Sequence, residues 1–186
     1  NGTDSFIKKE VDTWYSNTLG SSSYDADVTT GRFCSDSSGY QAETDYGFPD
    51  MGEYNLFASY DRLGQSINNY AKVNSPTLIC PATSESYGGS YRLKAGLITA
   101  DELVLAGENP GVVGNSYLNI GTNGSWYWSM TPDVFGDGLA YVWREDDALR
   151  DGYVGDHYAV HPVINVTTNN GFASGSGSVS DPYVIA

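Results

Sequence analysis

The sequence predicts an α+β domain with two early helices and a small, twisted, mostly antiparallel sheet with long loops. Of its 186 residues, 40% are hydrophobic and 17% are charged, and glycine (22) and tyrosine (15) are abundant. Such a composition is typical of short strands joined by many turns. Helical periodicity is clear only near the N-terminus, and strand patterns dominate the second half. A chain of this length is expected to form one core, so residues 1–186 are predicted to be a single domain.

Two helices are predicted in the first half. The clearer one lies in "TDSFIKKEVDTWYSNTLG", with Thr3 or Asp4 as the N-cap and Gly20 as the stop. Its apolar residues at helical spacing are Phe6, Ile7, Val11, Trp14 and Tyr15. A weaker helical pattern covers residues 54–69. Between the two helices, residues 21–49 have a loop-like composition, with "VTTGRFC" as the one short apolar element.

Short strands and one further helix follow. Residues 76–81, "PTLICP", read as a short strand bracketed by prolines. Leu97 and Ile98 are expected to end a strand, with Thr99 to Asp101 as the cap of a short helix that Gly107 ends. Later strand candidates lie within residues 115–132, 139–145, 158–166 and 181–186. Residues 167–181 read as a mobile or hairpin connection to a closing strand at Pro182 to Ile185.

The formal charge of −14, from nine basic and 23 acidic residues, argues against binding to nucleic acid or to an anionic membrane. There is no stretch of about 20 apolar residues, so direct membrane insertion is not expected. The sequence begins abruptly at "NGTDSF". We therefore expect a mature domain, or the C-terminal part of a longer exported protein.

Cys34 and Cys80 are the two cysteines. They are too far apart for a CxxC redox or zinc site, and both histidines lie elsewhere. A disulfide between them, in an extracellular protein, is the favoured interpretation, and two buried free thiols are the alternative.

Few residues carry a catalytic or metal-binding pattern. The chain contains no GxSxG motif. His161 is expected to be a strand histidine whose ring hydrogen-bonds to backbone, and His157 a surface residue. Glu145, Asp146, Asp147, Asp151 and Asp156 could supply oxygens to calcium, but their spacing is not that of an EF-hand, and a solvated acidic loop explains them more simply. No metal or cofactor is therefore predicted.

Aromatic residues carry the strongest functional signal. Trp126, Tyr127 and Trp128 alternate along a predicted strand, so one face can pack into the core while the other presents aromatic rings. From Tyr117 to Tyr158, Tyr, Trp, Asn, Asp, Ser and Gly crowd the turns, and this is the composition of an antibody paratope. Residues 143–158 show no usable periodicity, unlike the buried-strand pattern at Val160 to Val166.

Several segments resemble a known family. "GLITADELVLAG", "YWSMTP", "HPVINV" and "GSGSVSDPYVI" are similar to segments of exported bacterial and phage domains with a C-type lectin fold, in the version shared with formylglycine-generating enzymes. "VDTWYSNTL", "RFC" and "LICP" resemble the opening helix and cysteine region of the same family. The resemblance implies a C-type-lectin-like scaffold whose C-terminal part displays a ligand-binding surface.

Some relatives in that family are diversified by retroelements that mutate adenines, which scatter Tyr, Asp, Ser, Asn, His and Gly over a fixed frame. Residues 143–158 fit such a pattern. Two departures stand out: the family usually has arginine at the position of His161, and no cysteine follows Cys80. The second departure excludes the oxidase chemistry of formylglycine-generating enzymes.

We therefore expect a non-enzymatic ligand-binding or adhesion module, with residues 115–166 as the display region. It would be extracellular, on a cell surface or a phage particle, and would bind a protein or glycan on a host or bacterial surface. The expected anchors are Trp126, Trp143, Tyr153 and Tyr158, with Arg144 as a bidentate donor and Asp and Asn residues as a polar rim. The full set of expected contact residues is Tyr117, Asn119, Asn123, Trp126, Trp128, Asp133, Phe135, Tyr141, Trp143, Arg144, Asp146, Arg150, Asp151, Tyr153, Asp156, His157 and Tyr158.

Two alternatives stay open. The chain could be the head domain of a pilin or filament subunit whose tyrosine-rich surface packs against its own copies. It could also be a hydrolase with a carboxylate pair such as Asp133 and Asp137, although only their spacing supports this.

Overall fold

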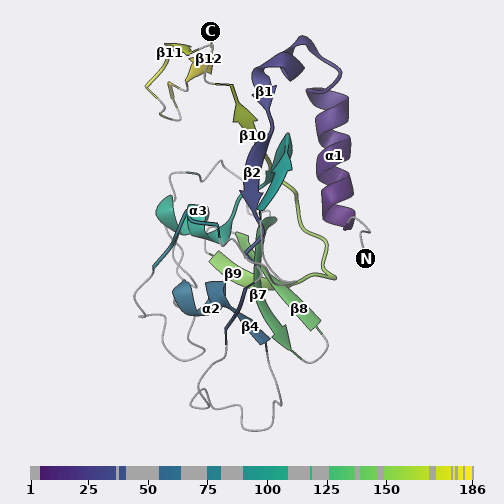
Figure 1. Ribbon diagram of the computed structural model, residues 1–186, viewed down its shortest axis with the longest axis vertical. Helices are drawn as coiled ribbons and strands as arrows, with labels where there is room; N and C mark the ends of the chain where they lie inside the picture. Colours follow the sequence, from purple (N-terminus) through teal and green to yellow (C-terminus); the bar gives the residue numbers. More distant parts are fainter. Residues whose placement is uncertain are drawn as a thin grey trace.

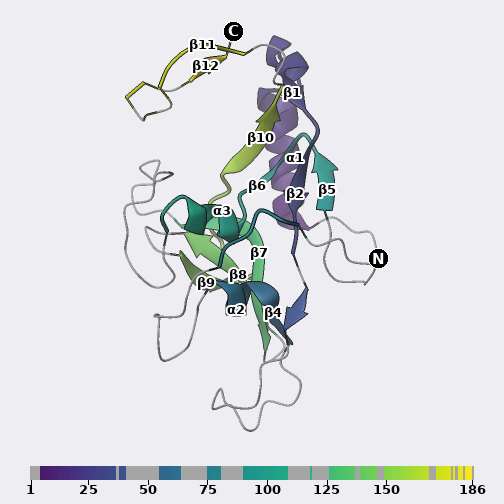
Figure 2. The same cartoon turned by 60° about the vertical axis from the view of Figure 1, so that its left-hand side comes forward.

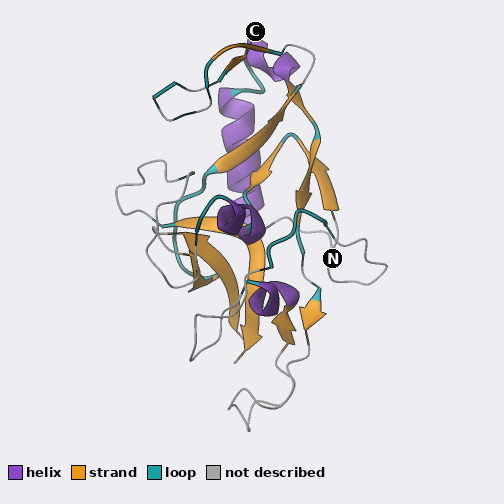
Figure 3. Cartoon of the chain, turned by 90° about the vertical axis from the view of Figure 1, so that its left-hand side faces the viewer, coloured by secondary structure: helices purple, strands orange, loops and turns teal. Residues whose placement is uncertain are grey.

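Figure 1 shows the computed structural model of the chain, and Figure 3 shows its secondary structure from another side. The structure describes residues 5–36, 38–40, 55–63, 75–80, 90–108, 118, 126–136, 139–145, 149–167, 171–176, 178, 180–181 and 183–185. For residues 39–40, 55–56, 61, 90–91, 134–136, 139–145, 172 and 185 it describes the backbone alone.

Short helices and strands make up these residues, and the described residues after 105 form strands but no helix. The helices are α1 (Phe6–Thr18), the 3-10 helix η1 (Ser23–Asp27), α2 (Ala58–Arg62) and α3 (Ala100–Leu105). The strands are β1 (Val28–Thr29), β2 (Gly31–Cys34), β3 (Gly39–Tyr40), β4 (Asn55–Phe57), β5 (Ser90–Leu93), β6 (Ala95–Leu97), β7 (Tyr127–Gly136), β8 (Leu139–Glu145), β9 (Leu149–Tyr153), β10 (Pro162–Val166), β11 (Phe172–Ser174) and β12 (Val184–Ile185). The predicted α+β class is confirmed.

The strands form several small antiparallel sheets. The largest has the order β3-β4-β7-β8-β9, and a three-stranded sheet has the order β1-β10-β6. The pairs β2-β5 and β11-β12 are separate two-stranded sheets. Helix α1 runs beside the three-stranded sheet, while α2 and α3 lie at the five-stranded sheet (Figures 1 and 3). No described helix is long and apolar enough to cross a membrane.

The first helix forms as predicted but begins later. Its N-cap is Ser5, whose Oγ accepts a hydrogen bond from the backbone N–H of Lys8 at 3.1 Å, so the expectation of Thr3 or Asp4 was wrong. Serine is as good an N-cap as aspartate, and the sequence offered three adjacent candidates. Helix α1 ends at Thr18, and the N–H of Gly20 closes the last turn on the carbonyl of Tyr15 at 2.8 Å.

Three segments differ from the sequence expectation. Where one helix was expected over residues 54–69, residues 55–57 form strand β4 and only Ala58–Arg62 is helical, while residues 64–69 lie outside the described part. "VTTGRFC" is two strands, β1 and β2, preceded by η1. The expected strand at 76–81 is absent from residues 75–80, which have no regular secondary structure. There the backbone N–H of Thr77 bonds to the carboxylate of Asp101 at 2.9 Å instead of to a neighbouring strand.

Helix α3 confirms the predicted cap. The Thr99 hydroxyl accepts from the N–H of Glu102 at 3.1 Å, and the Glu102 carboxylate accepts from the N–H of Thr99 at 2.8 Å. This reciprocal pair is a capping box, which satisfies two N–H groups that have no partner within the helix. Gly107 follows the helix with φ of 107°, a conformation that favours glycine.

The predicted strands of the second half are largely confirmed. Strand β8 covers the predicted residues 139–145, and β7, β10 and β12 lie within or overlap the other three candidates. The C-terminal connection is a hairpin, because β11 pairs with β12, and it projects at the end of the molecule opposite the five-stranded sheet (Figures 1 and 2).

Strand β7 separates two hydrophobic clusters. On one face, Tyr127 (4% exposed) packs with Leu63, Leu103 and Leu149. On the other, Trp128 (2% exposed) packs with Val11, Ala95 and Leu97, so this cluster joins α1 to β6. Because successive strand residues point to opposite faces, one dipeptide serves both clusters.

The disulfide between Cys34 and Cys80 is present, as predicted, with a Cα–Cα distance of 5.4 Å. It joins β2 to the irregular segment 75–80. A loop closed over a sequence separation of 46 residues stabilises a fold by about 4 kcal/mol on the chain-entropy account.

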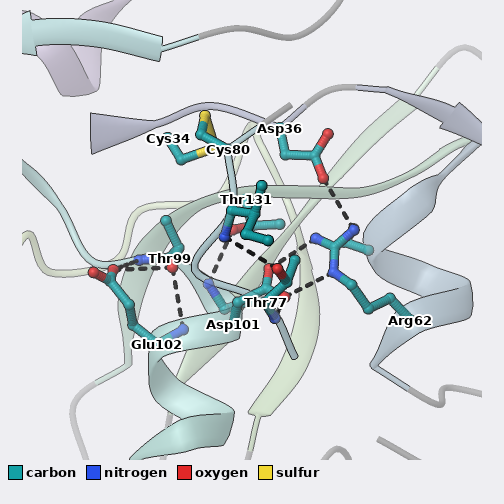
Figure 4. Close-up of polar contacts among 12 residues, drawn as sticks. Cys34, Asp36, Arg62, Thr77, Cys80, Thr99, Asp101, Glu102 and Thr131 are labelled. Carbon is teal, nitrogen blue, oxygen red and sulfur yellow. Dashed lines mark hydrogen bonds and ion pairs between the residues drawn. A yellow bond between two sulfur atoms is a disulfide. The ribbon is translucent and has the colours of Figure 1, made fainter. Parts of the chain in front are cut away.

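Arg62, the last residue of α2, lies between two buried carboxylates (Figure 4). Its Nε and one terminal nitrogen bond to both oxygens of Asp101, at 2.7 and 2.8 Å. Its other terminal nitrogen lies 3.0 Å from Oδ2 of Asp36. Burial works against the charge on Arg62, but the hydrogen bonds and charges of Asp101 and Asp36 outweigh it and raise the pKa of the guanidinium.

Arg62→Ala is expected to lower the free energy of unfolding by about 3–5 kcal/mol, because it leaves two buried carboxylates without their counter-charge. Urea unfolding measures this change. Lys8→Ala is the matched control, since it removes an exposed ion pair with Asp12 and should cost no more than about 0.5 kcal/mol. A loss below about 1 kcal/mol for Arg62→Ala would contradict the role given to this ion pair.

Candidate functional site

Three aromatic rings form a continuous stack from the surface into the core. Trp126, just before β7, is 39% exposed and meets Tyr158 edge-on, with ring centroids 5.1 Å apart and an interplanar angle of 65°. Tyr158 in turn lies against Trp128, at 4.5 Å and 54°. We call these three residues the aromatic ladder. Contacts of this kind add to the stabilisation that ring burial already gives.

Backbone hydrogen bonds fix the ladder on both sides. The N–H of Ala159 donates to the carbonyl of Trp126 at 2.8 Å, and the N–H of Trp128 donates to the carbonyl of Ala159 at 3.1 Å. Tyr127 and Ala159 thereby form a parallel bridge. The chain that leaves β9 is thus held against the start of β7.

Between β9 and this bridge, the chain exposes a short loop. Tyr153 is 43% and Val154 49% exposed, and Gly155, Asp156 and His157 are also exposed. The N–H of Asp156 closes a turn on the carbonyl of Tyr153 at 2.9 Å, and the Tyr158 hydroxyl donates to Oδ2 of Asp156 at 2.8 Å. We call Tyr153–His157 the display loop.

The display loop and Trp126 together offer apolar and polar groups to solvent. The rings of Trp126 and Tyr153 provide flat apolar surface, Asp156 provides a carboxylate, and His157 provides an imidazole. Rigid aromatic rings beside hydrogen-bonding groups suit the recognition of a partner surface, because they lose little conformational entropy on binding.

The expected contact residues divide into four groups, one of which is the buried pair Trp128 and Asp133. Trp126, Tyr153, Asp156, His157 and Tyr158 lie in the ladder and the display loop, with Asp151 exposed and Arg150 half-buried on the adjacent β9. Outside the described residues are Tyr117, Asn119, Asn123 and Asp146. For Phe135 in β7 and Tyr141, Trp143 and Arg144 in β8, the backbone is described and the side chain is not.

Trp128 and Asp133 are corrections to the expected set. They are 2% and 0% exposed, so neither presents a surface that a ligand could contact. Trp128 packs instead against Tyr158, which in turn meets the exposed ring of Trp126. Alternation along the strand predicts that one face is exposed. It could not identify Trp128 and Asp133 as buried, because β7 is covered on both faces.

Part of the irregular sequence from Trp143 forms strands, in β8 as far as Glu145 and in β9 from Leu149 to Tyr153. Strands β8 and β9 pair in antiparallel register from Tyr141–Tyr153 to Glu145–Leu149. After Tyr153, residues 154–157 form a turn and a loop. Within β9, Asp151 and Tyr153 are exposed, while Leu149 and Gly152 are buried.

His161 has a different environment from the expected one. Its ring stacks on Tyr127, with centroids 4.2 Å apart and planes 18° from parallel. The described residues provide no hydrogen bond to the imidazole, so the expected bond to backbone is not found. Burial lowers the pKa of His161. His161, singled out from the sequence, thus has its ring in the stack on Tyr127.

Asp133 is a buried carboxyl group in β7. Neither of its oxygens has a hydrogen-bond partner among the described residues. Burial, together with the negative charge of Asp151, raises its pKa well above the usual range. A carboxyl group with no accessible surface cannot contact a substrate in this structure, and Asp137, the other half of the expected hydrolase pair, lies outside the described residues.

No group of three or more His, Cys, Asp or Glu residues that could hold a metal ion occurs within the described residues. Of the five acidic residues weighed as calcium ligands, Asp146 and Asp147 lie outside that part, and the side chain of Glu145 is not described. Asp156 is held by the Tyr158 hydroxyl.

Val154 and Ala159 belong to this site but were not expected from the sequence. Val154 could have been found as an apolar residue between Tyr153 and Gly155 in a turn, where exposure is the rule. Ala159 contributes only backbone atoms, for which the sequence carries no signal.

Comparison with known proteins gives no match, whether with family models, with curated proteins or with solved structures. The class that the structure itself defines is an α+β protein with one intramolecular disulfide among its described residues.

Asp133→Asn is expected to change how stability depends on pH. The pKa of Asp133 is higher in the folded chain than the value of about 3.9 for an unfolded aspartate, so the folded state holds the proton more tightly. Stability from this group is fully present below about pH 4 and is lost as the pH rises toward the folded pKa.

Urea unfolding from pH 4 to 8 should therefore show a smaller loss of stability with rising pH for Asp133→Asn than for the wild type. Asp12→Asn, on the partly exposed surface of α1, is the control and should follow the wild type. Parallel curves for Asp133→Asn and the wild type would rule out a protonated buried Asp133.

Proposed function

We propose that this chain is an extracellular ligand-binding or adhesion module with a C-type-lectin-like fold. The ligand would contact the surface made by Trp126 and the display loop. The α+β architecture is compatible with this fold, and the sequence segments that resemble the family support it. The proposal does not include an enzymatic activity.

The observation that carries the proposal is the aromatic ladder. A tryptophan that is 39% exposed is costly in water, yet Trp126 is held in place by Tyr158, Trp128 and the bridge at Ala159. A ring used only for packing could bury its whole face. A ring that is fixed and partly exposed is preorganised for contact with a ligand, because it loses little further conformational entropy on binding.

A protein or a glycan on a host or bacterial surface is the proposed ligand. Both can stack on aromatic rings and bond to Asp156 and His157. Nucleic acid and anionic membrane are disfavoured as partners by the charge of −14. The disulfide suits the proposed location outside the cell, on a cell surface or a phage particle.

We further propose that residues 115–166 include positions diversified by an adenine-mutating retroelement. The display loop is a suitable target because its side chains point to solvent while its ends are held by backbone hydrogen bonds. Backbone bonds do not depend on side-chain identity, so exchange of Tyr153, Asp156 or His157 should leave the frame intact.

Trp126→Ala and Tyr153→Ala are each expected to weaken ligand binding by about tenfold or more, because aromatic anchors dominate such interfaces. Binding is measured on a glycan microarray and on a panel of intact bacterial cells, with the melting temperature recorded for every variant. Tyr24→Ala is the matched control, since Tyr24 is 65% exposed but lies in η1. The proposal fails if both variants unfold, or if both bind as well as the wild type.

The DNA beside the gene tests the diversification. We expect a reverse-transcriptase gene and a near-copy of the region that encodes residues 115–166, with differences concentrated at adenines. Sequencing several isolates should show substitutions at Tyr153, Asp156 and His157 and none at Leu149, which is fully buried. Substitutions spread evenly over buried and exposed positions would exclude this mode of variation.

A further inference from the structure

A second surface, distant in sequence from the display loop, presents two arginines without acidic partners. Three of the described basic side chains lie against carboxylates: Lys8 on Asp12, Arg62 on Asp36 and Asp101, and Lys94 on Asp25. Arg32 and Arg92 are different. Both are exposed, and neither forms an ion pair or hydrogen bond with the described residues. This is unexpected in a chain with 23 acidic residues and nine basic ones.

The two arginines are directly opposite each other. Strands β2 and β5 lie side by side as a ribbon (Figure 2), and their register pairs Arg32 with Arg92 and Phe33 with Tyr91. Cross-strand partners share a face, so the two guanidinium groups lie on the same side of the ribbon. Phe33 points to the other side, where it is 5% exposed and packs so closely on Gly96 that a Cβ there would come within 2.5 Å of the ring. Like charges in this position destabilise a strand pair.

Two exposed aliphatic residues continue this face. Cys34 lies two residues after Arg32 and so projects to the same side, where it is bonded to Cys80. The residues just before Cys80 are Leu78, 72% exposed, and Ile79, 80% exposed.

The segment that carries these aliphatic residues is held at several points. The N–H of Thr77 bonds to Asp101 at 2.9 Å, the N–H of Ile79 bonds to Oγ1 of Thr77 at 3.0 Å, and Cys80 is fixed by the disulfide. The exposure of Leu78 and Ile79 therefore belongs to a fixed backbone. Contiguous apolar side chains that stay exposed beside polar residues are a feature of interaction surfaces.

We propose that Arg32, Arg92, Leu78 and Ile79 form a basic-aliphatic patch that binds an acidic polypeptide segment of another protein, one in which carboxylates alternate with aliphatic residues. Arginine pairs with carboxylates through two parallel hydrogen bonds, and two arginines side by side match two acidic residues of such a segment. The partner's carboxylates would also remove the repulsion between Arg32 and Arg92.

The aliphatic half of the patch decides the class of partner. Leu78 and Ile79 can bury apolar side chains of a polypeptide, but they offer neither hydrogen bonds nor aromatic faces to the hydroxyl groups of an acidic polysaccharide. The net negative charge of the chain repels an acidic segment. Physiological salt screens charges beyond about 8 Å, so the attraction between the two arginines and the segment acts only at short range. Contact of the aliphatic residues would hold the acidic segment within that range.

The test uses a fluorescently labelled synthetic peptide of alternating glutamate and leucine, with fluorescence anisotropy to measure its Kd at physiological salt. Wild-type protein should bind it, and Arg32→Gln with Arg92→Gln should weaken binding by about tenfold or more. Leu78→Ser with Ile79→Ser should also weaken it. Lys8→Gln with Lys9→Gln removes the same charge from α1 and should leave the Kd unchanged.

Melting temperatures keep these results interpretable. The double arginine variant should melt no lower than the wild type, since it relieves a like-charge pair. The proposal is overturned if the wild type does not bind the peptide, or if the arginine variant binds it equally well. It is also overturned if polygalacturonate binds to the patch more tightly than the peptide. Trp126→Ala should not affect peptide binding, so this result is independent of the display loop.

Discussion

The ion pairs of Arg62 hold together parts of the chain that share no sheet. Arg62 ends α2, Asp101 is in the first turn of α3, and Asp36 follows β2. Asp101 also accepts the N–H of Thr77, close to the cysteine that is bonded to β2. Two helices, the β2 region and the disulfide segment are thus fixed around one guanidinium group. Such a pair tolerates little change, because both carboxylates are buried and depend on the same cation.

This constraint has consequences at the five-stranded sheet. Helices α2 and α3 supply Leu63, from the turn after α2, and Leu103 to the cluster that covers Tyr127. The cluster with Leu63 and Leu103 covers the face of β7 that carries Tyr127, and α1 packs on the face that carries Trp128. The first residues of β7 are therefore buried and can support the exposed residue before them. The ladder at Trp126 therefore rests on two hydrophobic clusters rather than on the loop that surrounds it.

Local signals in the sequence were sufficient for some elements. The helix cap at Thr99 and the strand at 139–145 were predicted correctly, because threonine is a favoured N-cap and residues 139–145 are a largely apolar run bounded by turn residues. The pairing of Cys34 with Cys80 followed from their being the two cysteines in the chain.

Elements that depend on distant partners could not be predicted. Residues 76–80 have a strand-like composition, but their hydrogen bonds go to the side chains of Asp101 and Thr77. Trp128 and Asp133 resembled contact residues because alternation cannot tell whether the second face of a strand is covered. His161 stacks on a tyrosine 34 positions earlier, which is a contact between segments that no local pattern encodes. Likewise, the site was recognised through its aromatic composition, while the bridge at Ala159 was not.

The order of strands β1-β10-β6 also bears on how the chain reaches this structure. The central strand of that sheet, β10, is the last of the three in sequence. Val28 in β1 therefore cannot pair until Val166 in β10 is present. Contacts between such distant residues must close a long loop before they contribute, which makes folding slow. The cluster around Val11 likewise needs Trp128 before it is complete. During synthesis or export, α1 and β1 would therefore emerge well before their partners. Until β10 has emerged, their apolar residues would stay exposed and could aggregate or bind a chaperone.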